Sequence, residues 1–577
     1  AGQASAAWQP AARLLSLGIE HLPPKSWETD HELTYALHLE LAESEYLSAR
    51  HEEAERLMML LLDRCKSKTC KAQVYHMKVN LHCTKSETQK AADTGLEGLR
   101  LFGIDLPLHP SSEEVQKEYE EVQRNLAGRP IEALVNLPLM TDPDMRAAMS
   151  ILSVLWVPAL STDANLTDLH IGRMVNICLR YGNTDAAIMG YALWGVSLLT
   201  TFHQYREGYR FGKLARDVMA KHGFVAYEAK LYYCLELIST WVEGIPRALE
   251  CARASFLAGV ERGDLGVACY CCDHIVALQL VQGVHLKEVH EETERGLTFV
   301  GAARFQDMVD IIGNMLRYVQ NMRGLTRRFS TFNDDHFDEA SFEAGFTPER
   351  TGSVVVWYWM LKMQARFMGG EHAEAMAAAQ KARDMLWASP PAHAQIHDFH
   401  LYAALLLSAV YDKASPEEQR QYAAWLSEHQ AQLKEWAESC PLSFLPSYAL
   451  VSAEIARIEG RALEASELYE RAIRAARESG FVHSEALGNE LATLYYLGRG
   501  LTTTAKGHLR RRTPATRAGV PTARRGSSSS STRICWTRRP PSTQPSPPRP
   551  SSSTTSPSPR HHRASRARSS CPGFQRR

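Results

Sequence analysis

The chain has 577 residues, of which 45% are hydrophobic and 23% charged, a composition typical of a folded protein with several domains or one long repeat array. The formal net charge of zero conceals a split. Residues 509–577 contain 16 Arg and no Asp, Glu or Lys, which leaves 49 basic against 65 acidic residues in 1–508. Since binding to nucleic-acid phosphates needs clustered Lys and Arg, this composition argues against a nucleic-acid groove in residues 1–508.

Helical periodicity runs through residues 8–500, and the period-2 alternation of strands is nearly absent. Brief breaks, mostly rich in Pro, interrupt it at 21–26, 105–112, 140–144, 389–393 and 440–447. Helices joined in this way predict an all-α fold. The longest apolar run, residues 186–202, is short for a membrane span and contains Gly, Ser and Thr. We interpret it as a buried helix and expect no membrane association.

A repeat underlies the helices: a starting residue is followed five and twelve positions later by apolar residues, nearly all of them small. The starting residues are Ala49, Ser86, His203, Gly370 and Gly460. Small residues seven apart lie on one helical face, where two antiparallel helices can approach closely. The spacing is similar to that of tetratricopeptide (TPR) repeats, with units of about 37–40 residues starting at 49, 86, 203, 243 and 283. We predict a TPR-like α-solenoid of stacked helical hairpins over residues 8–508 and a disordered tail over 509–577.

Catalytic motifs are missing from the sequence. It contains no GxxxxGK[ST] phosphate loop, no kinase catalytic loop, no HExxH and no GxSxG. We therefore expect no enzymatic activity in this chain and assign no catalytic, cofactor-binding or metal-binding residue. The twelve cysteines are scattered, and the one CxxC spacing, from Cys269 to Cys272, has no second pair; this is typical of reduced thiols and predicts a cytoplasmic location.

The sequence contains two clusters of potential metal ligands. In CYCCDH, Cys269 and Cys272 share one helical face while Cys271 and His274 share another, so each face carries at most two ligands, whereas zinc takes four. We interpret these cysteines as packed thiols. The second cluster places three histidines on one helical face after a Pro-rich turn, and we expect a solvated or capping role for them. Its members are His393, His397 and His400.

Two further features have a structural and a functional interpretation. Aromatic residues at helical spacing are expected in the core, although a solenoid could use them to line a binding face. They are Trp194, Trp241, Trp357, Trp359 and Trp436. The acidic run 111–125 is expected to be a solvated helix that is capped by Ser111 or Ser112 and has Glu residues in its first turn.

Several stretches together resemble the helical region of large multidomain signalling kinases. They are HELTYALHLELAESEYL (31–47), TGLEGLRLFGIDLPLHP (94–110), LRYGNTDAAIMGYALWG (179–195), YREGYRFGKLA (205–215), WAESCPLSF (436–444) and AEIARIEGRALEASELYERAIRAARESGF (453–481). In that family a Ser/Thr protein kinase and a predicted P-loop ATPase precede the helical region, and a GAF sensor and a histidine kinase follow it. The resemblance covers residues 10–508 and includes none of the family's catalytic motifs.

The resemblance implies that the chain is a non-catalytic interaction or regulatory arm from a larger kinase and ATPase protein. Its partners would be other proteins or neighbouring domains of the parent chain. The abrupt start without Met is what we expect of such a fragment. The alternative is the repeat region of an NTPase-class transcription regulator, with the basic tail binding nucleic acid. A third hypothesis, a metalloenzyme, requires stoichiometric zinc or iron.

The tail departs from the family pattern, which continues with a WGA-containing helical stretch. Codons that encode residues 518–525, when read one frame over, permit the sequence WGADGKA. GC-rich DNA read out of frame also yields the Arg, Pro, Ser and Thr that dominate residues 509–577. We therefore hypothesise that the tail is out-of-frame translation. The rival interpretation is a genuine basic disordered segment that binds polyanions in a salt-dependent way.

Overall fold

The computed structural model describes residues 2–511 apart from 86, 348–349 and 391, with side chains from residue 8 onward. Within this part every regular element is a helix, and the extended pairing there is an isolated bridge between Leu139 and Asn183. The prediction of an all-α fold is confirmed. The tail predicted from residue 509 lies outside the described residues from 512 on, but residues 509–511 still belong to the last helix, so the expected boundary was too early.

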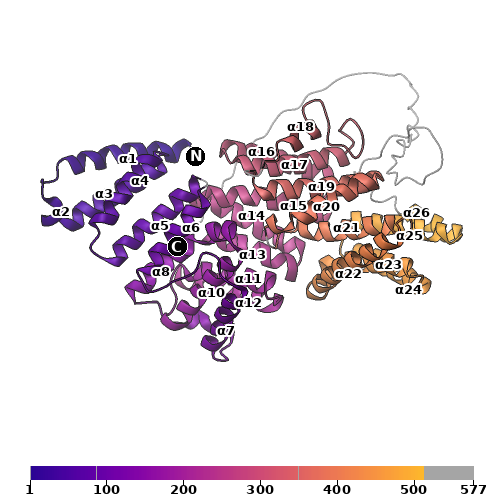
Figure 1. The fold of residues 1–577 in the computed structure, drawn as a ribbon, viewed down its shortest axis with the longest axis horizontal. Helices are drawn as coiled ribbons and strands as arrows, with labels where there is room; N and C mark the ends of the chain where they lie inside the picture. Colours follow the sequence, from indigo (N-terminus) through magenta and orange to yellow (C-terminus); the bar gives the residue numbers. More distant parts are fainter. Residues whose placement is uncertain (1, 86, 348–349, 391, 512–577) are drawn as a thin grey trace, which may run out of the picture. The chain divides into compact units, whose positions relative to one another are not determined.

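The helices follow one another along the chain (Figure 1). The first group is α1 (Gly2–Glu20), α2 (Ser26–Thr29), α3 (His31–Leu47), α4 (His51–Arg64), α5 (Lys68–Thr84), α6 (Thr88–Arg100), α7 (Ser112–Leu126) and η1 (Ile131–Asn136). The second is α8 (Pro143–Val154), α9 (Trp156–Thr162), α10 (Ala164–Tyr181), α11 (Ala187–Thr200), α12 (Tyr205–His222), α13 (Glu228–Val242), α14 (Ile245–Arg262), α15 (Leu265–Gln282), α16 (Leu286–Ala302) and α17 (Gln306–Met322). The third is α18 (Glu339–Ala344), α19 (Gly352–Gly369), α20 (His372–Asp384), η2 (Leu386–Ala388), α21 (Gln395–Tyr411), α22 (Pro416–Ser439), α23 (Pro441–Ile458), α24 (Ala462–Glu478), α25 (Val482–Gly498) and α26 (Thr502–Arg511).

Helices that are consecutive in the chain pack against each other as hairpins, among them α3 with α4, α5 with α6, α11 with α12, α13 with α14, α19 with α20 and α23 with α24. The helices α12, α14 and α16 begin at residues 205, 245 and 286, directly after the predicted unit starts at 203, 243 and 283. Four of the predicted starting residues have a positive φ that reverses the chain between helices: Ala49, His203, Gly370 and Gly460. The solenoid of stacked hairpins is confirmed.

The core consists of apolar helix faces buried between neighbouring hairpins. One cluster of buried residues extends from Ala72 to Ala505, and the helices α1, α3, α4 and α5 form a separate cluster from Ala12 to Leu81. The five tryptophans named above are between 1% and 6% exposed. The prediction that they belong to the core is confirmed, and they do not line an open binding face.

Contacts also join hairpins that are far apart in the chain. The indole Nε1 of Trp241, at the end of α13, donates a 2.9 Å hydrogen bond to the carbonyl oxygen of Ala392. The hydroxyl of Ser443, in α23, lies 3.1 Å from the backbone N–H of Ile245, which donates to it. These contacts bring the turn between α13 and α14 against the segment before α21 and against α23. The stack is therefore not held by neighbouring hairpins alone.

Three details differ from the sequence analysis. The segment 440–447, expected as a break, is mostly helical, because Pro441 occupies the first position of α23, where proline is tolerated. Residues 323–338, which were not expected as a break, lie between helices and contain no helix of their own. By length and composition α15 could cross a membrane, but 72% of that stretch is buried inside the molecule, as in a core helix.

Candidate functional site

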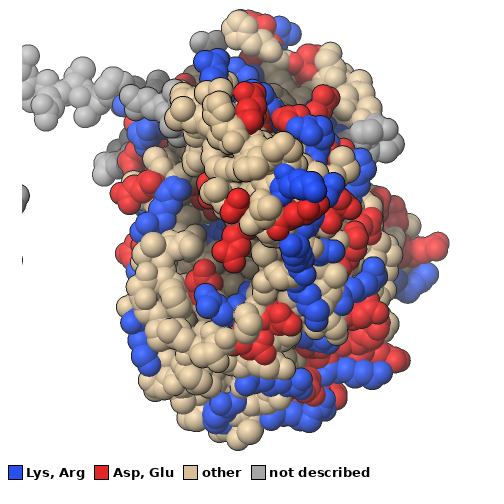
Figure 2. Space-filling view, turned by 90° about the vertical axis from the view of Figure 1, so that its left-hand side faces the viewer, with Lys and Arg blue, Asp and Glu red and all other residues tan. Residues whose placement is uncertain are grey.

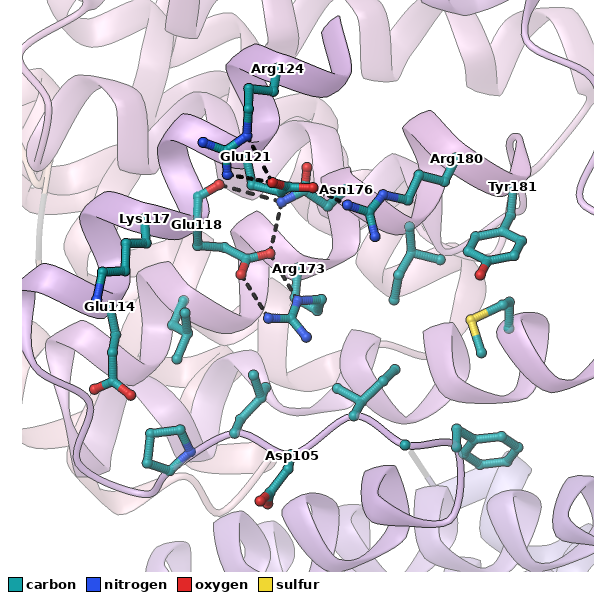
Figure 3. Close-up of a pocket in the computed structure, with 18 residues that line it drawn as sticks. Asp105, Glu114, Lys117, Glu118, Glu121, Arg124, Arg173, Asn176, Arg180 and Tyr181 are labelled. Atoms are coloured by element: carbon teal, nitrogen blue, oxygen red, sulfur yellow. Dashed lines mark hydrogen bonds and ion pairs between the residues drawn. The ribbon is translucent and has the colours of Figure 1, made fainter.

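A pocket of ≈ 580 Å³ opens between the segment that follows α6, the helices α7 and α10, and Met145 of α8 (Figure 3). Apolar side chains line part of it, including Ile104, Leu106, Leu169 and Ile177. Charged side chains of α7 and α10 line the rest. Seen from one side, the molecule carries interspersed acidic and basic side chains rather than a field of one sign (Figure 2).

The deepest charged group of the pocket is Glu118, which is 7% exposed. The Arg173 guanidinium binds both of its oxygens, with Nε 2.8 Å from Oε1 and Nη2 2.7 Å from Oε2. The side-chain amide of Asn176 donates a further 2.7 Å hydrogen bond to Oε1. Such a bidentate pair fixes the geometry of both side chains, and the pair raises the pKa of Arg173.

A second carboxylate of α7, Glu121, holds two guanidinium groups. Nε of Arg124 donates a 3.0 Å hydrogen bond to Oε2, and Arg180 is ion-paired with Oε1. These two cations lower the pKa of Glu121, the hydrogen bond from Arg124 being the larger cause. By contrast, Lys117 is exposed and forms no ion pair within the described residues. Lys117 is therefore the cation of the pocket that remains available to a ligand.

The local sequence explains how α7 comes to present these groups. The Ser111 hydroxyl accepts a hydrogen bond from the N–H of Glu114, whose carboxylate accepts one from the N–H of Ser111 in return, which is a capping box. The expected cap is thereby confirmed. On α10 the residue facing Glu118 is Gly172, where a Cβ atom would lie only 2.9 Å from Cγ of Glu118. The glycine makes room for the buried carboxylate.

The expectation that residues 111–125 form a fully solvated helix was wrong for Glu118. Its partner Arg173 lies 55 residues later, so no spacing within the run could reveal the pair.

The pocket contains four acidic and four basic side chains and therefore has no charge preference of its own. They are Asp105, Glu114, Lys117, Glu118, Glu121, Arg124, Arg173 and Arg180. Its apolar part and its paired charges suit a ligand with both apolar and polar groups, such as a protein segment.

The cysteine cluster of residues 269–274 lies inside α15. Cys269, Cys271 and Cys272 are at most 7% exposed. Burial raises the pKa of Cys269 to about 11 and that of Cys272 to about 12, so both are protonated at neutral pH. The interpretation as packed thiols is confirmed by their burial.

The expectation of solvated histidines was wrong, because α21 is covered by other helices. His393 is 0% and His397 5% exposed, and His400 is half-buried. Nε2 of His397 lies 2.8 Å from the Ser447 hydroxyl of α23, and Nδ1 of His400 lies 3.0 Å from Nδ1 of His429 in α22. The capping role applies to His393 alone, whose Nδ1 accepts a 3.3 Å hydrogen bond from the backbone N–H of Gln395.

One member of each cluster meets the other in space. The rings of His274 and His393 are edge to face with centroids 4.5 Å apart, and Nε2 of His393 lies 3.5 Å from Oδ2 of Asp273. Nδ1 of His274 lies 2.8 Å from Oε2 of Glu236 in α13. Burial lowers the pKa of His274, but the charge and the hydrogen bond of Glu236 together with the charge of Asp273 outweigh it, and the net shift of the pKa is upward. Trp357 stacks on His393 with centroids 4.3 Å apart and closes the cluster.

No protein-family model matches the chain. A curated relative is the hybrid signal transduction histidine kinase G of Dictyostelium discoideum, which is 20% identical over 325 residues. The alignment covers 52% of this chain and 9% of that protein. The match therefore spans less than a tenth of the relative's length.

Solved structures with some similarity are helical proteins of low sequence identity. The apo form of the quorum sensor NprR from B. thuringiensis is 8% identical with a TM-score of 0.26, over 83% of this chain and 97% of that one. Naa15/Naa10 bound to HypK-THB is 13% identical with a TM-score of 0.23, over 84% and 79%. A circular tandem repeat protein is 13% identical with a TM-score of 0.17, over 88% and 98%. These TM-scores are too low to carry an argument.

Proposed function

We propose that the helical array is a non-catalytic regulatory arm of a larger cytoplasmic signal-transduction kinase, and that it binds neighbouring domains or other proteins. The observation that carries the proposal is the similarity to a signal transduction histidine kinase over 325 residues of a chain built from stacked hairpins. Repeat arrays of this kind offer extended surfaces for protein partners. The finer assignment to a parent that also contains an ATPase and a GAF sensor rests on the family resemblance.

The pocket between α7 and α10 is the proposed binding position. Its apolar side can receive apolar side chains of a partner, and the ion pairs around Glu118 and Glu121 keep its charged side rigid. Because acidic and basic side chains are equal in number there, a protein segment fits better than a polyanion. Lys117 would pair with an acidic residue of that segment.

The gene that encodes the chain offers the first test. We expect an ATPase module upstream of these codons and GAF and histidine-kinase modules downstream, in one frame or the next. A helix-turn-helix module downstream instead would replace the proposal with a transcription regulator. An uninterrupted, well-covered reading frame through codons 508–516 would refute the frameshift hypothesis.

Binding gives the second test. The flanking domains are purified, labelled and titrated with the 577-residue chain, and the dissociation constant is measured by fluorescence anisotropy. Lys117→Glu and Tyr181→Ala alter exposed side chains of the pocket and are expected to weaken binding about tenfold or more each, as central interface residues do. Lys287→Glu, an exposed charge reversal on α16, is the matched control. If the wild type and the three variants bind the flanking domains with equal affinity, the pocket is excluded as the binding position.

A further inference from the structure

We propose that Asp273, His274 and His393 bind a divalent transition-metal ion, for which zinc is the best fit, in a site enclosed by the fold. Carboxylate and imidazole groups are the ligands that zinc takes in proteins alongside thiolates. One ligand atom from each of the three residues lies within 4.8 Å of the other two. The ion would be structural, and no catalytic step is implied.

The spacing of these atoms is close to what zinc requires. Zinc–nitrogen and zinc–oxygen bonds of about 2.0–2.2 Å in a tetrahedron place ligand atoms about 3.3–3.6 Å apart. Oδ2 of Asp273 and Nε2 of His393 are already 3.5 Å apart, longer than an ordinary hydrogen bond and within the range that zinc requires. The three residues supply three of the four ligands of a tetrahedral zinc, and their ligand atoms, which lie within 4.8 Å of one another, would draw closer around the ion.

The charge of the cluster also calls for a cation. Glu236 and Asp273 are 0% and 1% exposed, and neither forms an ion pair with Lys or Arg within the described residues. These two buried carboxylates face two imidazoles and have no Lys or Arg partner within the described residues. Uncompensated buried charge is strongly destabilising, and a divalent ion bound directly to the cluster compensates it.

Several polar atoms of the cluster are buried without a hydrogen-bond partner. They are Oε1 of Glu236, Oδ1 of Asp273 and Nε2 of His393. Buried polar atoms in proteins are nearly always partnered, so three such atoms in one cluster indicate a missing ligand. Binding at Nε2 of His393 would move the ring proton to Nδ1, which would end the 3.3 Å contact with the N–H of Gln395.

Glu236 has the position of a residue that orients a metal ligand. It holds the Nδ1 proton of His274 at 2.8 Å, which leaves the lone pair of Nε2, now 3.1 Å from the Tyr233 hydroxyl, for a metal. Carboxylates that hold metal-bound histidines in this way typically contribute 10–100-fold to affinity. Glu236 is therefore a positioning residue of the site. The ion would tie α13, α15 and the segment before α21 together across 157 residues of sequence.

The test uses the full 577-residue chain, stripped of metal with a chelator and titrated with Zn²⁺ against a chromophoric competitor. We expect one tight site per chain, and Co²⁺ in its place should show the visible absorption of a site with nitrogen and oxygen ligands. His393→Gln and Asp273→Asn should abolish tight binding, and Glu236→Gln should weaken it about 10–100-fold. His170→Gln, an equally buried histidine on α10, is the matched control.

A melting experiment distinguishes loss of metal from loss of folding. Zn²⁺ should raise the melting temperature of the wild type and the His170→Gln variant and leave that of Asp273→Asn unchanged. Equal zinc binding by the wild type and His393→Gln, or no tight binding by the wild type, would overturn the proposal.

Discussion

The backbones of Gly195 in α11 and Gly208 in α12 are in direct contact. A Cβ atom on Gly208 would lie 2.5 Å from the carbonyl oxygen of Gly195, and one on Gly195 would lie 2.6 Å from the carbonyl oxygen of Gly208. Real Cβ atoms essentially never approach a backbone oxygen this closely. The small residues of the repeat therefore do what the sequence predicts: they let paired helices touch.

Gly208→Ala is accordingly expected to destabilise the array. Alanine favours a helix by up to about 1 kcal/mol over glycine, but the clash forces the two backbones apart, and overpacking costs about 1–3 kcal/mol. We expect a lower melting temperature by circular dichroism. Gly313→Ala in α17, whose Cβ would meet no atom within 4 Å, is the control and should raise it. A higher melting temperature for Gly208→Ala would contradict the close packing.

Arg173→Ala should destabilise the region around the pocket. It leaves the buried carboxylate of Glu118 without its bidentate partner, and breaking a buried pair costs about 3–5 kcal/mol, less here because Arg173 is 32% exposed. Arg100→Ala, which breaks an exposed pair with Asp105, should cost at most about 1 kcal/mol. Urea unfolding followed by circular dichroism measures both, and equal midpoints would show that Glu118 does not depend on Arg173.

Ser443→Ala tests the contact between distant hairpins. The hydroxyl accepts a hydrogen bond from the buried N–H of Ile245, 198 residues away, and an unpartnered buried donor costs about 1–3 kcal/mol. Amide hydrogen exchange should accelerate at the turn between α13 and α14. Ser161→Ala removes an exposed hydroxyl that bonds within α9 and should leave that turn unaffected. Unchanged exchange in Ser443→Ala would mean that neighbouring hairpins alone hold the turn.

Acid should weaken the fold through buried histidines. Burial lowers the pKa of His170 to about 4, against about 6.5 when unfolded. The unfolded chain binds more protons between these values, so this contribution is complete above pH 6.5 and is lost as the pH falls towards 4. The melting temperature of His170→Gln should therefore fall less between pH 7 and 4.5 than that of the wild type. The exposed His21→Gln is the control, and parallel pH profiles for all three proteins would refute the assignment.

The periodicity and the small residues determined the all-α fold, the hairpins and their turns at Ala49, His203, Gly370 and Gly460, because these features depend on residues within one or two helices. The cap at Ser111 was predictable for the same reason. The start of α23 was not, because proline is accepted in a first helical turn as readily as in a loop.

Only the tertiary structure decided which side chains meet. Arg173 reaches Glu118 across 55 residues, and His393 reaches Asp273 across 120, so neither the pocket nor the buried cluster has a signature in local spacing. Neither cluster of potential metal ligands offers enough ligands within its own stretch of sequence, and the fold brings Asp273 and His274 of one to His393 of the other. The sequence by itself determined the helices and their pairing. The burial of α15 and of the segment before α21 between other helices determined which of their polar groups share one site.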